Sequence, residues 1–245
     1  SEQYTYDADD RLISFKEGAL SAGTIPVPLT QTQYNYDGVG NRISFVKDLN
    51  TTSYTVNAVN EYATFLDTVL HMPTYDLNGN ALNDTKHSYQ YDDNNKLISV
   101  DNGSTAIYQY DALERRIRRT TTSDTISYYY DGQRVIEERD PSDAVKATYV
   151  YGTSIDDIVS MRRNGTDYYY HQNSLGSVVA VTNASGMVVE RYEFDAFGKP
   201  SIYAADYTPR SSTAIGNVYM FTGREFDAET GNYYYRAREY SPLLG

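Results

Sequence analysis

The sequence predicts an all-β protein made of antiparallel β-hairpin repeats, which form a single spiralling sheet that is a shell or a partial barrel. Three observations predict this fold class. A tyrosine–aspartate motif returns about every twenty residues, strand-like alternation flanks its copies, and no segment shows the helical period of about 3.6 residues. Repetition on this scale indicates a surface-building protein before it indicates a catalytic centre.

The motif consists of two tyrosines separated by one residue and followed by aspartate. Its full copies are Tyr4-Thr5-Tyr6-Asp7, Tyr34-Asn35-Tyr36-Asp37, Tyr89-Gln90-Tyr91-Asp92, Tyr108-Gln109-Tyr110-Asp111 and Tyr128-Tyr129-Tyr130-Asp131. Weaker copies are Tyr149-Val150-Tyr151-Gly152, Tyr168-Tyr169-Tyr170-His171 and Tyr192-Glu193-Phe194-Asp195. We interpret the tyrosines and aspartates of the full copies as structural residues of the repeat.

Each full repeat predicts a hairpin. Tyr34 and Tyr36 alternate onto one face of a strand, residues 37–41 supply turn chemistry, and residues 42–45 return as a second strand. The same pattern predicts hairpins over 4–15, 75–80, 89–100 and around Asp131-Gly132, with tight connections at Asn102-Gly103 and Asn164-Gly165. The aspartate recurs with the turn, so we predict that it caps the turn and does not act as a catalytic carboxylate.

Two stretches are irregular, and the pattern changes near the C-terminus. Residues 18–30, with two prolines, predict an inserted loop, and residues 56–71 predict a degenerate repeat. From residue 168 onward the tyrosine repeats give way to a different block. The sequence therefore predicts a hairpin array over 1–167 and a second segment over 168–245.

The last block reads Phe221-Thr222-Gly223-Arg224-Glu225-Phe226-Asp227-Ala228-Glu229-Thr230-Gly231-Asn232-Tyr233-Tyr234-Tyr235-Arg236-Ala237-Arg238-Glu239-Tyr240-Ser241-Pro242. Together with the repeats, it resembles the YD-repeat or rearrangement-hotspot (Rhs) proteins, which are related to toxin-complex shells and teneurins. The resemblance covers nearly the whole chain. It marks a set of core-motif residues, namely Gly223, Asp227, Gly231, Tyr233, Tyr235, Arg236, Arg238 and Tyr240.

This resemblance implies a β-ribbon wound into a hollow shell that encloses a C-terminal toxin or effector polypeptide. It also implies a bacterial protein that is secreted, extracellular or at the cell surface. In many such proteins an autoprotease with an Asp-Pro-x-Gly-like motif releases the cargo. The single Asp-Pro of this chain is Asp140-Pro141, far upstream of the block. We therefore expect no enzymatic activity from this chain, which reads as a piece of a longer polypeptide.

The composition of the chain makes some classes of partner and covalent cross-link improbable. The net charge of −12 disfavours nucleic acid, because phosphate binding needs a basic face. The basic cluster Arg115–Arg119 is interpreted as a solvated strand edge in preference to a polyanion site. Without cysteine there is no disulfide, and without an apolar run of membrane length there is no predicted membrane span.

No cofactor or metal is predicted. Calcium remains a minor alternative at Asp76–Asn80 and Asp7–Asp10, which gather oxygen donors but lack the terminal glutamate of a complete loop. The three histidines are far apart, and we expect His171 to have a structural hydrogen-bonding role.

Three functions stay open at this point. The first is a non-enzymatic shell module whose partners are the rest of a larger polypeptide and a toxin cargo. The second is a self-assembling extracellular tube or filament, because open sheets leave edges that another copy can extend. The third is an adhesin whose exposed tyrosines, such as Tyr129 and Tyr169, bind glycans. The alternative to glycan binding is that the tyrosine rings stack on neighbouring rings across strands.

Overall fold

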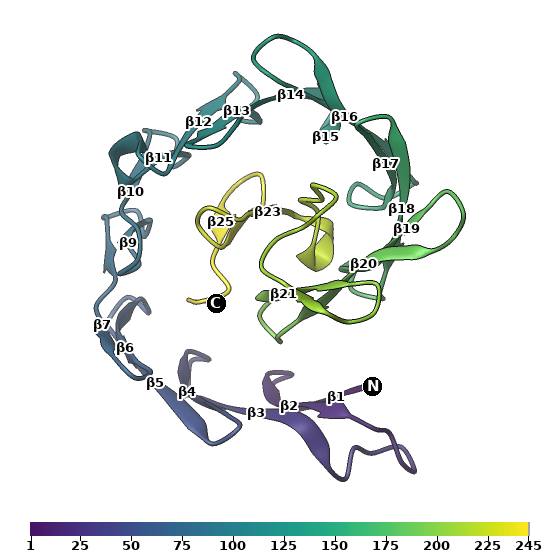
Figure 1. Ribbon diagram of the computed structural model, residues 1–245. Coiled ribbons are helices and arrows are strands. Elements are labelled where there is room, and N and C mark those ends of the chain that lie inside the picture. Colours follow the sequence, from purple (N-terminus) through teal and green to yellow (C-terminus); the bar gives the residue numbers. More distant parts are fainter. Residues whose placement is uncertain (245) are drawn as a thin grey trace. The chain divides into compact units, whose positions relative to one another are not determined.

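A computed structural model describes residues 1–244, and their regular structure consists of β-strands and two short 3₁₀ turns, η1 (Asp101–Gly103) and η2 (Phe221–Gly223). The fold class that the sequence predicts, all-β with antiparallel hairpins, is therefore confirmed. The chain divides into two compact units, one over Ser1–Ser88 and one from Tyr89 onward (Figure 1). Each unit is described by itself.

The first unit contains a seven-stranded antiparallel sheet in which sequential strands are neighbours. Its strands are β1 (Glu2–Tyr6), β2 (Leu12–Gly18), β3 (Pro28–Tyr36), β4 (Arg42–Lys47), β5 (Asn50–Val56), β6 (Tyr62–Leu66) and β7 (Leu70–His71). A separate hairpin follows, formed by β8 (Thr74–Tyr75) and β9 (Ala81–Asn83).

The second unit contains a thirteen-stranded antiparallel sheet, again in sequential order. Its strands are β10 (Tyr89–Tyr91), β11 (Leu97–Val100), β12 (Ala106–Tyr110), β13 (Arg116–Thr121), β14 (Thr125–Asp131), β15 (Arg134–Arg139), β16 (Val145–Tyr151), β17 (Ile158–Arg163), β18 (Thr166–Gln172), β19 (Val178–Asn183), β20 (Val188–Phe194), β21 (Pro200–Ala204) and β22 (Pro209–Arg210). A small sheet of β23 (Glu225–Asp227), β24 (Asn232–Tyr234) and β25 (Glu239–Tyr240) completes the unit.

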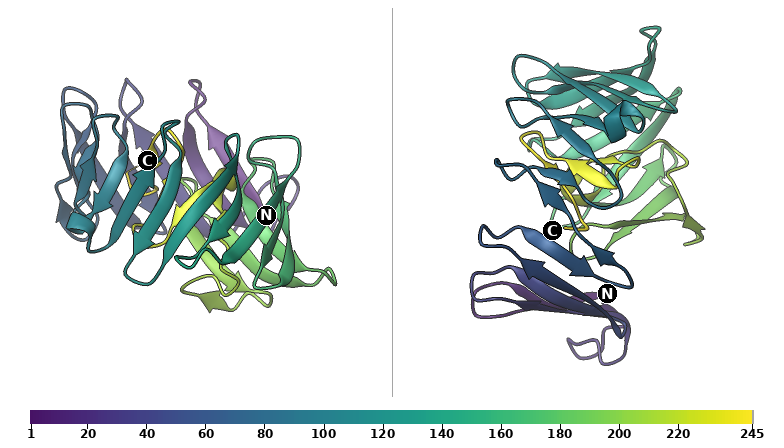
Figure 2. Two further views of the ribbon diagram at one scale, coloured as in Figure 1. Left: turned by 90° about the horizontal axis from the view of Figure 1, so that it is seen from above. Right: turned by 90° about the vertical axis from the view of Figure 1, so that its left-hand side faces the viewer.

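Within the second unit the large sheet curves around the C-terminal segment. Figure 1 shows β23 and β25 inside the arc that runs from β10 to β21, and the right-hand view of Figure 2 shows the yellow segment between the teal and green parts of that arc. The backbone joins the two parts, since the Val178 amide donates to the Met220 carbonyl at 3.0 Å. Buried residues of the sheet, among them Ile158 and Val181, also form one hydrophobic cluster with Met220 and Tyr233 of the C-terminal segment, so this face of the sheet is buried.

The motif aspartate organises its turn in the way the sequence predicts. One carboxylate oxygen of Asp37 accepts hydrogen bonds from the amides of Val39 (3.0 Å) and Asn41 (2.8 Å), and the other accepts from the Asn41 side chain (2.8 Å). These bonds lower the pKa of Asp37, the one from the Asn41 side chain most of all. The same arrangement recurs at Asp7, Asp76, Asp92, Asp111, Asp140 and Asp195.

Asp131 departs from this arrangement. It ends β14 directly opposite Arg134, so only Gly132 and Gln133 remain to make the turn, and Gly132 takes the positive φ of 58° that such a tight turn needs. In a turn of two residues, the amides of the residues two and four positions after Asp131 cannot point back at its carboxylate. The turn-capping role predicted for the motif aspartate is therefore wrong at this copy.

The two tyrosines of each motif have different roles. The first one is buried in all the full copies except the edge copy at Tyr4; the buried ones are Tyr34, Tyr89, Tyr108 and Tyr128. The second one follows a β-bulge, as between Gln109 and Tyr110, and its hydroxyl donates to a backbone carbonyl of the preceding hairpin. Four pairs show this bond: Tyr36 to Leu12 (2.7 Å), Tyr110 to Leu97 (2.8 Å), Tyr130 to Arg116 (2.7 Å) and Tyr151 to Val135 (3.0 Å). In these four copies the second tyrosine thus fastens its hairpin to the one before it, whereas the Tyr170 hydroxyl of the weaker copy donates to Asn217 Oδ1 at 2.9 Å.

The predicted hairpins and connections are confirmed. The pairs β1–β2, β3–β4, β8–β9, β10–β11 and β14–β15 match the predicted hairpins, and the connections at Asn102-Gly103 and Asn164-Gly165 join β11 to β12 and β17 to β18. The degenerate repeat folds as β5, β6 and β7, with Asn57 in the place of the capping aspartate. The predicted division between a hairpin array over 1–167 and a second segment over 168–245 remains a prediction.

Candidate functional site

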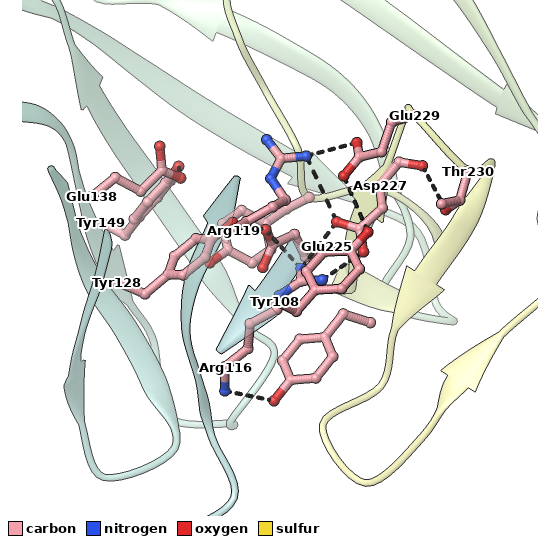
Figure 3. A network of polar contacts seen from close by, with 12 residues as sticks. Tyr108, Arg116, Arg119, Tyr128, Glu138, Tyr149, Glu225, Asp227, Glu229 and Thr230 are labelled. Carbon is pink, nitrogen blue, oxygen red and sulfur yellow. Dashed lines mark hydrogen bonds and ion pairs between the residues drawn. The ribbon is translucent and has the colours of Figure 1, made fainter. Parts of the chain in front are cut away.

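The candidate site is a buried ionic cluster between β13 of the large sheet and β23 of the C-terminal segment. Arg116 and Arg119 come from β13, while Glu225 and Asp227 come from β23 (Figure 3). Because side chains alternate along a strand, Glu225 and Asp227 lie on one face of β23. The cluster is thus made by two segments that are far apart in sequence.

Arg116 is fully buried and has two carboxylate partners. Its two terminal nitrogens contact the two oxygens of Asp227 at 2.5 and 3.0 Å, which is bidentate pairing, and Nη2 also lies 2.9 Å from Glu225 Oε1. Asp227 is buried to the same degree, with 1 % of its surface exposed. Burial on this scale makes each charge dependent on the other, because neither can recover its water.

Tyrosine rings enclose the Arg116 guanidinium. Its central carbon lies 4.2 Å from the ring centroid of Tyr234, 5.0 Å from that of Tyr108 and 5.7 Å from that of Tyr128, all within cation–π range. The Tyr128 hydroxyl donates to Glu225 at 2.6 Å, and the Arg116 backbone amide donates to the Tyr234 hydroxyl at 3.0 Å. The repeat tyrosines Tyr108 and Tyr128 therefore serve the site as well as the sheet.

The cluster carries more carboxyl groups than guanidinium groups. Arg119 adds an ion pair with Glu229 at 2.9 Å, and Glu239 lies close enough to interact electrostatically with Asp227 and Arg116. Burial raises the pKa of Asp227 to about 6, and burial together with the Asp227 charge raises the pKa of Glu239 well above its usual range. Burial also opposes the ionisation of Glu225, but Arg116 and Arg119 outweigh it and hold the pKa of Glu225 below its usual range.

Further buried carboxylates follow the inner side of the large sheet. Glu138 pairs with Arg163 at 2.5 Å and accepts from the Tyr149 hydroxyl. Glu190 is fully buried; it pairs with Arg210 at 2.9 Å and accepts from the Ala214 amide at 2.8 Å. These groups lie among the apolar residues of the core, such as Ile158, Met161 and Val181, so the inner side holds the C-terminal segment by apolar packing as well as by specific polar bonds.

The interpretation of Arg115–Arg119 as a solvated strand edge is wrong. β13 is an inner strand, between β12 and β14, and Arg116 and Arg119 point at the C-terminal segment. The error has a physical cause: their carboxylate partners lie about a hundred residues on, so no local pattern indicates that the charges are neutralised. Arg115 does face the turn, where it pairs with Asp111 at 2.6 Å.

The core-motif residues surround this segment. Asp227 is in the cluster, and Gly231 accepts a positive φ of 78° while its amide donates to the Asp227 carbonyl at 2.8 Å. Tyr233 and Tyr240 donate to the carbonyls of Gly198 (2.8 Å) and Phe197 (2.8 Å), which fastens the small sheet to the large one.

The remaining core-motif residues lie near η2. Gly223 has a φ of 71°, and a Cβ there would meet the Asp156 carbonyl oxygen at 2.7 Å, so the backbone approach requires glycine. The Tyr235 hydroxyl lies 2.6 Å from Thr222 Oγ1, and Arg236 pairs with Asp156 at 2.6 Å. Arg238 is exposed, and its backbone carbonyl accepts from the Tyr235 amide at 2.9 Å.

Sequence reasoning missed Glu225, Glu138 and Glu190. A signal was present for Glu190, which alternates with the buried Tyr192 along β20 and so points inward. In β15 the buried Val135 and Glu138 are three residues apart, so alternation does not place Glu138 inward. Among residues 1–244 no three His, Cys, Asp or Glu side chains are placed to hold a metal ion, and no helix is long and apolar enough to cross a membrane. His171 lies in β18, where its Nε2 is 3.1 Å from Thr182 Oγ1.

Comparison with known proteins gives the family. The model of the Teneurin YD-shell family matches residues 1–245. The tRNA nuclease WapA of Bacillus subtilis (strain 168) is 34% identical over 226 residues, which is 88% of this chain and 9% of the relative. Teneurin-3 of Mus musculus is 24% identical over 163 residues, 61% of this chain and 6% of the relative.

Among solved structures, the crystal structure of TcdB2-TccC3 aligns with a TM-score of 0.49 at 16% identity, covering 100% of this chain and 17% of that one. The chain therefore spans only a small part of the curated relatives it matches. The match of the family model over the full sequence decides the assignment, and it agrees with the resemblance of the tyrosine–aspartate repeats. The chain belongs to the Teneurin YD-shell family.

Proposed function

We propose that this chain is a non-catalytic wall segment of a larger secreted shell polypeptide that encloses and delivers a C-terminal toxin or effector. One observation carries the proposal: the inner side of the second unit's sheet holds a polypeptide segment through buried ionic and tyrosine contacts, with Arg116 paired to Asp227 and Glu225. A sheet of this kind presents a lining of apolar, tyrosine and charged side chains that retains a protein chain. Relatives of much greater length, one of them named a tRNA nuclease, support a larger polypeptide with a cargo.

The proposal is tested on the complete polypeptide that contains this sequence. Limited proteolysis with and without mild denaturant should leave the region C-terminal to the shell resistant only while the shell is folded, and electron microscopy should show a closed particle. Cleavage of that region at the same rate in both conditions would refute encapsulation. The Asp227→Ala variant serves as a probe, because loosening the lining should speed that cleavage.

A second candidate is self-assembly into a tube or filament. It is favoured by the open order of the seven-stranded sheet, in which β1 is a terminal strand with its motif tyrosines Tyr4 and Tyr6 exposed at 39% and 55%. Light scattering and negative-stain microscopy of the 245-residue chain separate the two candidates. A monodisperse monomer refutes self-assembly, while fibres of uniform diameter support it.

Glycan binding has no support from the relatives. Tyr129, one of the tyrosines considered for it, is occupied by its neighbours: Arg139 lies 4.6 Å from its ring centroid, and its hydroxyl donates to Asp143 at 3.2 Å.

A further inference from the structure

A half-open pocket lies in the second unit between the hairpin turns at one rim of the large sheet and the C-terminal segment. Four arginines line it. Arg115 comes from the turn before β13, Arg134 begins β15, and Arg224 and Arg236 come from the C-terminal segment. The convergence is notable in a chain of net charge −12, because chance would place carboxylates there more often.

The positive charges of the pocket are incompletely neutralised by its own carboxylates. Arg224 and Arg236 share a single carboxylate, Asp156, at 3.1 and 2.6 Å. Arg134 donates to the backbone carbonyls of Thr153 (3.2 Å) and Ser154 (2.9 Å), and among residues 1–244 no carboxylate pairs with it. Glu225 also lines the pocket, but its charge is used by Arg116.

The walls between these charges are apolar and aromatic. Arg115 lies over the Tyr130 ring at 4.8 Å and Arg134 over the Tyr151 ring at 5.6 Å, so the rings hold the guanidinium groups in place. Val135 and Ile155 complete the lining. Burial and the neighbouring Arg236 charge lower the pKa of Arg224, despite the opposing effect of Asp156, which fits a surplus of positive charge.

We propose that this pocket binds the carboxylate side chain of an acidic, partly apolar polypeptide segment. Planar guanidinium groups match a carboxylate with paired hydrogen bonds, and a surplus of fixed positive charge favours an anion. Because the pocket is half open, a carboxylate side chain can enter it while the flanking apolar neighbour rests at its mouth. An inorganic anion would leave the tyrosine rings, Val135 and Ile155 uncovered. This inference is independent of the proposed encapsulation, because it concerns a rim pocket and not the inner lining.

The test is a binding titration of the intact 245-residue chain followed by nuclear magnetic resonance of the arginine side-chain N–H groups. The probe is an acetylated, amidated leucine–glutamate dipeptide; the matched neutral probe carries glutamine. We expect the acidic probe to saturate with a dissociation constant on the order of 1 mM, as suits a ligand of this size, and the neutral probe to bind at least about tenfold more weakly.

Two variants and one control localise the binding. Arg134→Gln should weaken the acidic probe about tenfold or more, since one charge-assisted hydrogen bond is lost. Ile155→Glu, at a side chain that is 43% exposed and so tolerant of change, should abolish binding by placing a carboxylate in the pocket. Arg162→Gln removes an arginine of the same unit that does not line the pocket, and it should change nothing.

Three results would overturn the proposal. They are equal binding of the acidic and neutral probes, binding that survives both pocket variants, and saturation of the same signals by inorganic phosphate at a lower concentration than the dipeptide needs. The last result would assign the pocket to a free anion. Circular dichroism of each variant shows whether it is folded, and Ile155→Glu keeps the proposal testable even if Arg134→Gln does not fold.

Discussion

Replacing Arg116 with methionine should destabilise the second unit more than any surface substitution. The change keeps a long apolar stem but removes the guanidinium that contacts Asp227 at 2.5 and 3.0 Å and Glu225 at 2.9 Å. Both carboxylates are buried, so they cannot take up water in its place. Removing one partner of a buried pair costs about 3–5 kcal/mol of unfolding free energy.

The same loss of unfolding free energy corresponds to a decrease in melting temperature. For a unit of this size, 1 kcal/mol shifts the midpoint by about 2–4 °C, so Arg116→Met should lower it by roughly 6–20 °C. The matched control is Arg162→Met, whose pair with Asp167 is largely exposed at 60% and 41% and should contribute about 1 kcal/mol or less.

The assay is thermal and urea unfolding followed by circular dichroism, with hydrogen exchange read by mass spectrometry to locate the loss. Peptides covering β23 and β24 should lose protection in Arg116→Met, while those covering β1 and β2 in the first unit should not change. If Arg116→Met and Arg162→Met differ by less than about 1 kcal/mol, the buried pair does not hold the segment as argued. Arg116→Met with Asp227→Leu completes a double-mutant cycle, and it should be less harmful than the sum of the two single changes.

Three further predictions follow. Glu239→Gln should stabilise the chain near neutral pH and have little effect below about pH 4.5. In the folded state the pKa of Glu239 is raised from 4.5, and that of Asp227 is raised from 3.8 to about 6. The stability that these two groups contribute is therefore present at low pH and is lost as the pH rises through their folded-state pKa values. The measurement is the urea midpoint of the unchanged chain and of Glu239→Gln across this pH range, and a constant difference between the two at every pH would contradict the prediction. Tyr130→Phe should lower the free energy of unfolding by about 0.5–1.5 kcal/mol, because it removes the 2.7 Å hydrogen bond to the Arg116 carbonyl. Tyr129→Phe is its control, since the Tyr129 hydroxyl makes only an exposed 3.2 Å hydrogen bond. Equal urea midpoints for the two variants would count against the fastening role of Tyr130. Gly223→Ala should lower the melting midpoint through about 1–3 kcal/mol of strain, since its φ is 71° and its Cβ would meet a backbone oxygen at 2.7 Å. Gly186→Ala is the control, because Gly186 has a similar φ of 75° but open space around it. Equal losses of stability in the two variants would show that the clash at Gly223 adds nothing to the cost of the backbone conformation.

The sequence predicted the parts of this fold that depend on short-range chemistry. Asp37 caps its turn through residues two and four positions on, and each hairpin pairs a strand with the next one. Such contacts repeat wherever the motif repeats, so one copy predicts the others. The exception at Asp131 is also local, because the turn there is two residues long and excludes the capping geometry.

The candidate site could not be predicted in the same way, because its energy comes from contacts that do not repeat. Arg116 meets Asp227 across 111 residues of sequence, and only the curvature of the sheet brings them together. Considered alone, a run of four arginines in an acidic chain is typical of a solvated strand. The repeat nevertheless contributes to the site, because Tyr108 and Tyr128 occupy ordinary motif positions. Arg116 stands opposite the second motif tyrosine, at the position where β11 and β15 carry Leu97 and Val135 and where β4 carries Arg42. A charged residue at an inward position between two buried motif tyrosines does not by itself indicate a docked segment, because Glu138, between Tyr128 and Tyr149, pairs with Arg163 of the same sheet. The partners of Arg116 follow only from the three-dimensional arrangement, since nothing within its own hairpin distinguishes the two cases.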